Sequence, residues 1–305
     1  MKKILVAGDI NVDLICSGYQ AFPAPGKEVL VDDFVMTLGG SSAICAMGLA
    51  RLGNPVAFIG KVGADSWGDY CIETLRAAGI DVSGLSRDPA LRTGVTISIT
   101  SAVDRALVTF AGSVAALRAA DVDAWALDDA AHLHVSSFFL QKDLRPAFRR
   151  LFALAHSSGL STSLDPGFDP SERWDRDLLE TLEAVDVLLP NETELAAISG
   201  TTDLADGLRR LINGRTRVVA KLGQRGSATL ERDALLEIPA FAVDPIDTTG
   251  AGDSFDAGFL HSWLRELPIH ECLRWGSACG ALSVRGLGGT PSQPDAAEVR
   301  ALLAT

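Results

Sequence analysis

The chain has 305 residues, of which 47% are hydrophobic, and a formal net charge of −12. This composition predicts a globular protein with a large buried core. The acidic charge excludes a broad basic surface of the kind that binds nucleic acid or an anionic membrane.

The five cysteines are scattered and show no C-x-x-C spacing, which is typical of reduced thiols rather than of disulfides or a zinc site. The apolar run that follows Lys3 ends at Asp9, so it is too short for a signal peptide or a membrane span. We therefore expect a cytoplasmic protein that binds neither nucleic acid nor membrane.

From the amino terminus onward, short β-type runs alternate with helical segments. The expected buried strands are residues 4–8, 56–62, 132–136, 160–165, 185–189 and 217–222. The expected helices are residues 41–52, 66–78, 144–157, 192–198, 204–212, 250–265 and 270–285. This alternation predicts an α/β fold, with a mainly parallel sheet and helices on both faces.

Two stretches break the alternation, at approximately residues 13–37 and 91–110. Both are rich in Val, Ile, Leu, Thr and Phe, and neither has a helical stripe. We expect them to pair as a small antiparallel flap, which forms a β lid inserted in the core. No repeat, low-complexity tract or charged linker divides the chain, so residues 1–305 are expected to form a single domain.

The segment 244–260 reads DPIDTTGAGDSFDAGFL, a turn of small residues that leads into an apolar helix. Gly250, Ala251 and Gly252 leave amide N–H groups unobstructed at a helix start, where the helix dipole adds about half a positive charge. Asp253 follows in the first turn, where a carboxylate can accept the proton of an attacking hydroxyl. Taken alone, the same pattern also suits a simple helix cap with an acidic first turn.

With its surroundings, this segment closely resembles the carboxy-terminal signature of the PfkB or ribokinase-like carbohydrate kinases, commonly D-T-x-G-A-G-D-x-F. The resemblance continues through the turn at Gly39 and Gly40 and covers about residues 4–295. It implies a ribokinase-like three-layer α/β/α core and transfer of the γ-phosphate of ATP, with Mg2+, to an alcohol group of a sugar or sugar-like molecule. In that reaction Asp253 is the catalytic base, and the amides of residues 250–252 form the anion hole. A homodimer formed through the lid is a further implication.

The resemblance also implies nucleotide and metal sites. The nucleotide-binding residues that it implies are Asn191, Lys221, Gly223, Gly226, Thr248, Gly250, Gly252 and Ser277. Glu194 belongs to an N-x-x-E element that handles magnesium, usually through water, although the same spacing is also a capping box. Asp247 and Thr249 match positions that hold a monovalent cation in several members, so K+ is a further candidate.

Asn11 and Asp13 follow the first strand, at the edge where open α/β sheets bind ligands. Both match positions that contact sugar in ribokinase-like enzymes, although a solvated turn is the other interpretation. The full predicted substrate-binding set is Asn11, Asp13, Gly39, Gly40, Ser41 and Asp253. The match fails at Ile44, where a sugar-binding Asn is common, and at Ser41, where ribokinases have Lys. We therefore expect a pocket less polar than a ribose site, suited to a modified sugar, a sugar acid or a nucleoside.

Three alternatives stay open at this point. A nucleoside kinase would share the fold and the chemistry. A nucleotide-dependent oxidoreductase would share the sheet pattern, but no G-x-G-x-x-G turn follows the first strand. A non-catalytic sugar-sensing protein would keep the fold without turnover, and the intact Asp253 argues against it.

Overall fold

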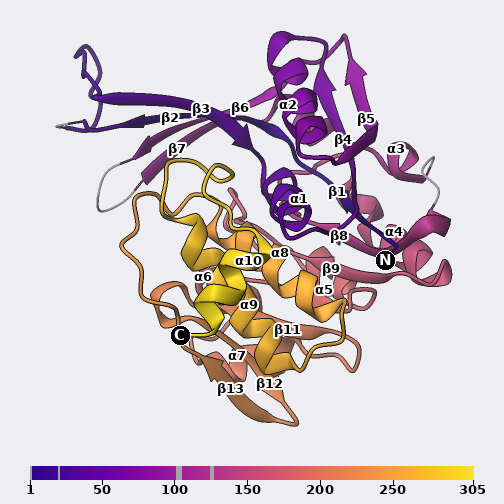
Figure 1. Cartoon of the computed structure of the whole chain (residues 1–305). Coiled ribbons are helices and arrows are strands. Elements are labelled where there is room, and N and C mark those ends of the chain that lie inside the picture. Colours follow the sequence, from indigo (N-terminus) through magenta and orange to yellow (C-terminus); the bar gives the residue numbers. More distant parts are fainter. Residues whose placement is uncertain (1, 20, 101–104, 124–126) are drawn as a thin grey trace.

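The computed structural model describes residues 2–19, 21–100, 105–123 and 127–305. A nine-stranded sheet lies at its centre (Figure 1). In spatial order its strands are β13 (Ala234–Ile238), β12 (Ser227–Glu231), β11 (Arg217–Lys221), β10 (Val187–Leu188), β9 (Ser161–Leu164), β8 (Ala130–Val135), β1 (Lys3–Ala7), β4 (Val56–Gly63) and β5 (Asp81–Asp88). All pairs from β11 to β5 are parallel, and β12 and β13 add an antiparallel edge. The predicted mainly parallel sheet is therefore confirmed.

The six expected strands correspond to β1, β4, β8, β9, β10 and β11, which form the interior of this sheet. The sequence pattern misses β5, β12 and β13, the strands at the two ends of the spatial order. Strands at an edge have less of their surface buried, so β5 and β13 carry no continuous apolar run. The expected strand at 185–189 is also longer than β10, which has two residues.

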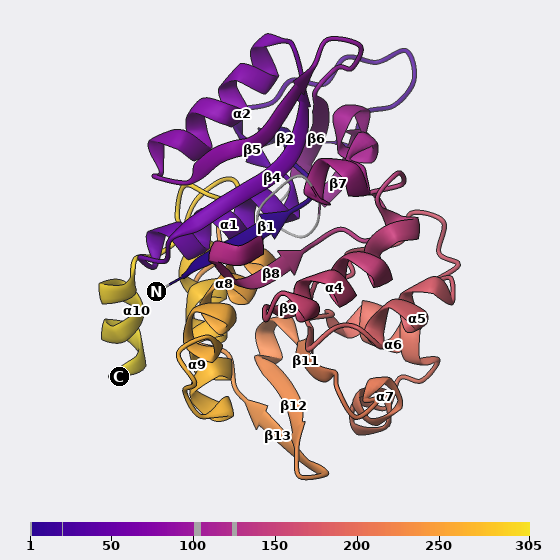
Figure 2. The ribbon, with the colours of Figure 1, turned by 90° about the vertical axis from the view of Figure 1, so that its right-hand side faces the viewer.

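Helices cover both faces of the sheet (Figures 1 and 2). One hydrophobic core includes Ile4 and Val6 of β1 and contributions from α1 (Ser41–Arg51), α2 (Ser66–Ala77), α8 (Ala251–Trp263), α9 (Ile269–Ser283) and α10 (Ala296–Leu303). The other core includes Leu5 and Ala7 and contributions from α3 (Ala119–Asp123), α4 (Phe148–Ser157), α5 (Asp177–Leu182), α6 (Glu192–Ser199) and α7 (Leu204–Leu211). Successive side chains of a strand point to opposite faces, which is how β1 supplies both cores. The predicted three-layer α/β/α architecture is confirmed.

The helix expected at 144–157 begins later than the sequence pattern predicts. Residues 145–147 form a short 3₁₀ turn, and α4 starts at Phe148. Pro146 lies in this turn, where its missing N–H costs nothing because the first N–H groups of a helix have no partner within it. The short helices α3, α5 and α10 were not among the expected elements.

Four further strands form a second, smaller sheet that projects from the body of the molecule (Figure 1). Its spatial order is β3 (Asp33–Gly39), β2 (Asn11–Ser17), β6 (Gly94–Thr100) and β7 (Arg105–Phe110). This sheet is the predicted lid; residues 20 and 101–104 of the lid segments lie outside the described residues.

The expectation of an antiparallel flap is wrong for the central pair of the lid. The outer pairs are antiparallel, whereas β2 and β6 run parallel. β2 follows β1 and β6 follows β5. In the main sheet β1 and β5 lie on either side of β4 and run in the same direction. Chains that leave parallel strands in the same direction form a parallel pair when they meet.

Two findings bear on the expected environment. Within the described ranges, no helix combines the length and apolarity needed to cross a bilayer. The five cysteines are all free thiols.

Candidate active site

Helix α8 begins at the small-residue turn that the sequence predicts as the anion hole. Gly250, the N-cap, has a φ of 71°, in the left-handed region that favours glycine. A Cβ at this position would lie only 2.6 Å from Cα of Gly289, so the turn also needs glycine for space. The N–H of Ala251 donates to the carbonyl of Thr248 at 3.3 Å, and the amides of the first turn have no partner within the helix. Residues 250–252 therefore lie at a helix N-terminus, as predicted.

Asp253 lies in the first turn of α8 and is buried. The hydroxyl of Ser41, at the start of α1, faces this carboxylate and lowers its pKa against the effect of burial. Burial, followed by the negative charge of Asp165, raises the pKa of Asp253 well above its ordinary value. A raised pKa makes the ionised carboxylate a stronger base, which is the property that proton abstraction from an alcohol requires.

Asp9, which the sequence analysis did not assign a role, holds the start of α1 in place. Its two carboxylate oxygens accept the backbone N–H groups of Ser41 and Ser42, each at 2.9 Å. The hydroxyl of Ser137, a residue with a φ of 57°, donates to the same carboxylate at 2.9 Å. Asp9 follows β1, and a carboxylate just beyond a parallel strand was the available signal.

Behind the start of α8, a lysine lies among three carboxylates. Nζ of Lys221 is 2.7 Å from Oδ2 of Asp165 and 3.2 Å from each carboxylate oxygen of Asp256. Carboxylate oxygens of Asp165, Asp253 and Asp256 lie within 4.8 Å of one another, close enough to share a metal ion. Because the ammonium of Lys221 already pairs with two of them, we do not interpret the cluster as a metal centre.

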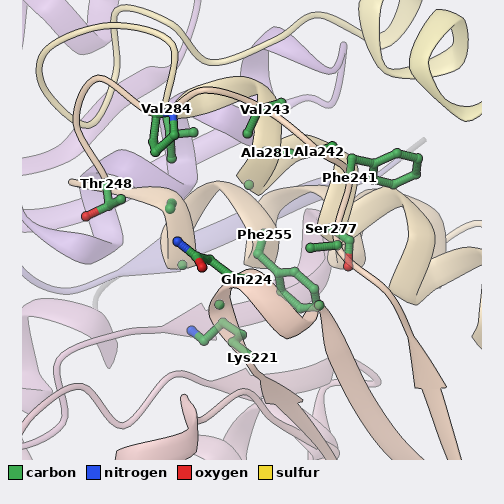
Figure 3. Close-up of a pocket in the computed structure, with 17 residues that line it drawn as sticks. Lys221, Gln224, Phe241, Ala242, Val243, Thr248, Phe255, Ser277, Ala281 and Val284 are labelled. Atoms are coloured by element: carbon green, nitrogen blue, oxygen red, sulfur yellow. The ribbon is translucent and has the colours of Figure 1, made fainter.

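A cavity of about 570 Å³ opens beside the start of α8 (Figure 3). This volume falls in the range of roughly 300–1,000 Å³ that is usual for small-molecule sites. The predicted nucleotide-binding residues that line it are Lys221, Gly223, Gly226, Thr248, Gly252 and Ser277. Asn191 and Gly250 are not among its lining residues.

The two ends of the cavity differ in chemistry. Figure 3 shows Lys221 at one end and the apolar side chains of Val243 and Val284 at the other. The segment from Ala240 to Pro245 and the helix residues Phe255 and Ala281 complete the apolar walls. Sequence reasoning missed these residues because small and apolar side chains in this pattern carry no signal of a ligand. A flat, apolar group would fit one end and an anionic group the other.

The turn between β11 and β12 forms one wall of the cavity. Gly226 has a φ of 100°, and a Cβ there would lie 2.0 Å from the carbonyl oxygen of Ile238, so glycine is required at this position. The hydroxyls of Ser227 and Ser277 are 3.1 Å apart and join β12 to α9.

Asn191 and Glu194 form the capping box that the sequence analysis left as an alternative. Oδ1 of Asn191 accepts the N–H of Glu194, and Oε2 of Glu194 accepts the N–H of Asn191, each at 2.9 Å. Asn191 also makes a parallel bridge to Lys221, which places Glu194 beside the charged cluster. Burial, followed by the charge of Asp165, raises the pKa of Glu194 to about 7. Because the cap uses Oε2, the carboxylate can still offer Oε1 to a hydrated magnesium ion.

Asp247 ties the turn before α8 to a later loop. Its Oδ1 accepts both the N–H and the hydroxyl of Thr249, at 2.9 and 2.8 Å, and its Oδ2 accepts the N–H of Gly288 at 2.8 Å. The predicted cation residues are thus in contact, and the buried carboxylate of Asp247 joins the two loops.

Polar groups gather on one face of the lid. Nδ2 of Asn11 donates to Oδ1 of Asp13 at 2.7 Å and to Oγ1 of Thr96 at 3.3 Å. A Cβ at Gly39 would lie 2.1 Å from Oδ1 of Asp13, so glycine leaves room for that carboxylate. Asn11 and Asp13 are buried residues of strand β2, and the interpretation of a solvated turn is therefore wrong.

Gly40 and Ile44 surround the start of α1. Gly40 has a φ of 93°, and a Cβ there would lie 2.7 Å from the carbonyl oxygen of Asp9. Ile44 is buried, and a Cβ at Gly289 would lie 2.5 Å from its Cδ1. Ile44 therefore fills space between α1 and the Gly289 loop, and its side chain offers no hydrogen bond to a ligand.

Comparisons with known proteins agree with this architecture. The model of the pfkB family of carbohydrate kinases matches residues 1–296. An ATP-dependent ribose-1-phosphate kinase from Halopiger xanaduensis is 32% identical over 304 residues, which cover 99% of this chain and 98% of that protein. A ribokinase from Lactococcus lactis is 26% identical and covers 99% of this chain and 97% of its own length.

Solved structures give the same result. An E. coli protein assigned as a ribokinase II, in complex with ATP and Mg2+, matches 100% of this chain and 99% of its own, with a TM-score of 0.85 and 25% identity. A double mutant of a Vibrio cholerae fructokinase, bound to fructose, ADP and a potassium ion, matches 99% of this chain and 98% of its own, with a TM-score of 0.85 and 26% identity. The chain belongs to the pfkB family of carbohydrate kinases.

Proposed function

We propose that this protein transfers the γ-phosphate of ATP to an alcohol group of a sugar or sugar-like small molecule. The observation that carries the proposal is the position of the buried Asp253. It lies in the first turn of α8, next to Gly252 on the cavity wall, and the side chain of Ser41 faces it from the start of α1. One carboxylate therefore lies between the wall of a nucleotide-sized cavity and the helix that follows lid strand β3.

In the proposed reaction, the adenine of ATP occupies the apolar end of the cavity and the phosphates extend towards Lys221 and Gly252. The substrate lies between Asp253 and the polar face of the lid, which carries Asn11 and Asp13. Asp253 accepts the proton of the substrate hydroxyl as that oxygen attacks the γ-phosphorus. The amides of residues 250–252 stabilise the charge that develops on the transferred group, and closure of the lid excludes water.

Two metal ions have candidate residues in this site. Glu194 would hold Mg2+ through water, and the ion would neutralise charge on the phosphates of ATP. Asp247 and Thr249 would hold K+ and stiffen the turn that leads into α8. Turnover with K+ compared with Na+ tests the second assignment.

The polar residues of the lid suit hydroxyl groups in general and do not select one particular sugar. We propose a pocket less polar than a ribose site, because the buried Ile44 supplies no hydrogen bond. A modified sugar, a sugar acid and a nucleoside stay the candidate substrates. The related ribose-1-phosphate kinase adds a sugar phosphate to the compounds worth testing.

A coupled assay of ADP release tests this function directly. The purified protein should release ADP with ATP, Mg2+ and at least one member of a panel of free sugars, sugar acids, sugar phosphates and nucleosides. Efficient phosphorylation of free ribose alone would reject the less polar pocket. Tight sugar binding without any turnover would support the sugar-sensing alternative, whereas the family assignment gives no support to an oxidoreductase.

We also propose a homodimer formed through the lid. One lid face, called here the apolar lid face, carries three cross-strand rows in which every residue is apolar. The rows are Leu38, Val12, Val95 and Phe110; Met36, Leu14, Ile97 and Val108; and Phe34, Cys16, Ile99 and Ala106. Its exposed members include Phe34, Met36 and Val108, with 56%, 42% and 61% of their surface accessible. A second copy of the chain would remove this surface from water.

With reduced thiols and no membrane-spanning helix among the described residues, we further propose that this reaction takes place in the cytoplasm.

A further inference from the structure

Two carboxylates behind the anion hole have no part in the proposed reaction. Asp165 follows β9, and Asp256 lies one turn beyond Asp253 on α8. Asp256 is 0% exposed and Asp165 is 5% exposed. Burying an ionised carboxylate is costly unless a partner compensates for the lost hydration. For both residues the partner is Lys221, and at Asp256 its charge opposes the rise in pKa that burial causes.

Lys221 contacts both carboxylates and the cavity. An ammonium group has three N–H donors. Nζ is 2.7 Å from Oδ2 of Asp165 and 3.2 Å from both oxygens of Asp256, a geometry in which one N–H can bridge the Asp256 carboxylate and leave the third for a ligand. Lys221 also lines the cavity, and a Cβ at Gly252 would lie 3.4 Å from its Nζ. The ammonium therefore lies against Gly252 of the anion hole, at the polar end of the cavity.

Two carboxylate partners fix both the charge and the position of this ammonium. Burial alone would lower the pKa of Lys221, but the charges of Asp165 and Asp256 outweigh it and raise that pKa above its ordinary value. A lysine has a flexible four-carbon stem, so a single partner would let the ammonium move about that contact. A second partner from a different element, α8, removes this freedom.

We infer that Asp256 is a positioning residue for phosphoryl transfer, which together with Asp165 holds the Lys221 ammonium against Gly252, where the terminal phosphate of ATP would lie. The inference rests on the proposed function and deepens it. The fixed ammonium adds a full positive charge to the partial charges of the amides at residues 250–252, and a preorganised charge stabilises a developing anion without reorganisation.

The position of Asp256 on α8 gives the arrangement a mechanical consequence. Asp253 and Asp256 are three residues apart, so they lie on neighbouring positions of one helix face. The same helix therefore presents the base, the anion-hole amides and the anchor of the lysine. Any shift of α8 moves all three together, which keeps their mutual geometry.

A double-mutant cycle tests whether Asp256 acts through Lys221. The variants are D256N, K221M and the double variant, each compared with wild type for kcat and for binding of ADP and of a nonhydrolysable ATP analogue by calorimetry. D186N is the matched control, because Asp186 pairs with Arg215 and His156 at the start of β10, at the opposite end of the strands from the site.

We expect D256N to lower kcat about 10-fold and K221M about 100-fold, and the double variant to match K221M within about 3-fold. D256N should also weaken binding of the ATP analogue about 5-fold, because in the proposed complex Lys221 faces the terminal phosphate. Binding of ADP, which lacks that phosphate, should stay near wild type. The D186N control should resemble wild type in every measurement. Losses in kcat that multiply in the double variant, or an unchanged kcat in D256N, would overturn the inference.

Two further outcomes are separable. K221M should fold, because burial raises the pKa of Asp256 and a protonated Asp256 can donate a hydrogen bond to Asp165. If K221M does not fold, a comparison of D256N with D186N by the same kcat and binding measurements decides whether Asp256 is a positioning residue. If wild type turns over no substrate, the proposed function fails, and the positioning role is decided by the difference between analogue and ADP binding alone.

Discussion

The proposed nucleotide side and the proposed substrate side of Asp253 are built from different kinds of structure. The nucleotide side is a cavity in the body of the fold, between β11, α8, α9 and the segment 240–245, and its walls are backbone and packed apolar side chains. The substrate side is a separate four-stranded sheet. One of its faces carries the polar side chains of Asn11, Asp13 and Thr96, and the other carries exposed apolar residues. The first is formed by the core itself, whereas the second depends on where the lid lies.

This difference assigns the two halves of the chemistry to two parts of the chain. In the proposed function, phosphate binding uses groups that belong to the core, namely Lys221 and the start of α8. Substrate choice would depend on the lid and on Ile44 at the start of α1. Substitutions on each side should therefore change different kinetic constants, and Asp253, where the sides meet, should change the rate itself.

The largest expected effect is that of D253N. The substitution removes the proton acceptor and keeps the shape of the side chain, so kcat should fall by about 10² to 10⁴-fold, with little change in ATP affinity. Steady-state kinetics measures kcat, and calorimetry with a nonhydrolysable ATP analogue measures the affinity. A near-normal kcat would show that Asp253 is not the base and that it does not link the nucleotide side to the substrate side.

The next effect concerns the outer surface of the substrate side. Met36 and Val108 lie in one row of the apolar lid face, so the double variant M36D/V108D places two charges where a second copy would pack. Burial of unpaired charge should weaken the dimer by about 10²-fold or more, as measured by sedimentation velocity over a concentration series. L107D is the matched control, because Leu107 is exposed on the opposite face of the same strand. A wild-type chain that is monomeric at every concentration contradicts the proposed homodimer.

The same division explains how far the sequence could be interpreted. Buried parallel strands and the turn at residues 250–253 have local signals, namely apolar runs and a glycine-rich helix start. Asp165 and Asp256 have no such signal, because their role arises only where β9, β11 and α8 meet. The apolar wall of the cavity is likewise formed by ordinary core residues.

The lid shows a second limit of sequence reasoning. Its strands are evident from composition, but the parallel pairing of β2 and β6 follows from the path of the chain through β4 and β5. The role of Glu194 could not be decided from the sequence, for a different reason. A capping box and a magnesium ligand need the same residues at the same spacing, so one sequence pattern serves both.

A smaller effect, confined to substrate affinity, should follow from G39A. The added Cβ would lie 2.1 Å from Oδ1 of Asp13 and would force that carboxylate to turn away from its position beside Asn11. Loss of one charged hydrogen bond should raise KM for the sugar about 10-fold, with KM for ATP unchanged. G207A in α7 is the control, because its Cβ would meet nothing closer than 3.1 Å and lies on a helix remote from the site. An equal rise in KM for both substrates would show that the two sides are not independent.

The smallest effect is the contribution of Glu194 to the dependence of stability on pH. The pKa of Glu194 rises from 4.5 to about 7 on folding, chiefly through burial. The folded chain therefore keeps a proton that the unfolded chain releases near pH 4.5, so this contribution to stability is full below pH 4.5 and is lost as the pH rises through 7. Between pH 6 and pH 7 this contribution of Glu194 to the free energy of unfolding should fall by about 1 kcal/mol. The buried His132, His134 and His261, whose pKa values folding lowers, contribute changes of the opposite sign that wild type and E194Q share. In E194Q, the side-chain carbonyl can still accept the N–H of Asn191 but cannot ionise. Urea titrations at the two pH values should therefore give a change in wild type that is about 1 kcal/mol more negative than the change in E194Q. An equal change in both proteins would contradict the assignment of this titration to Glu194.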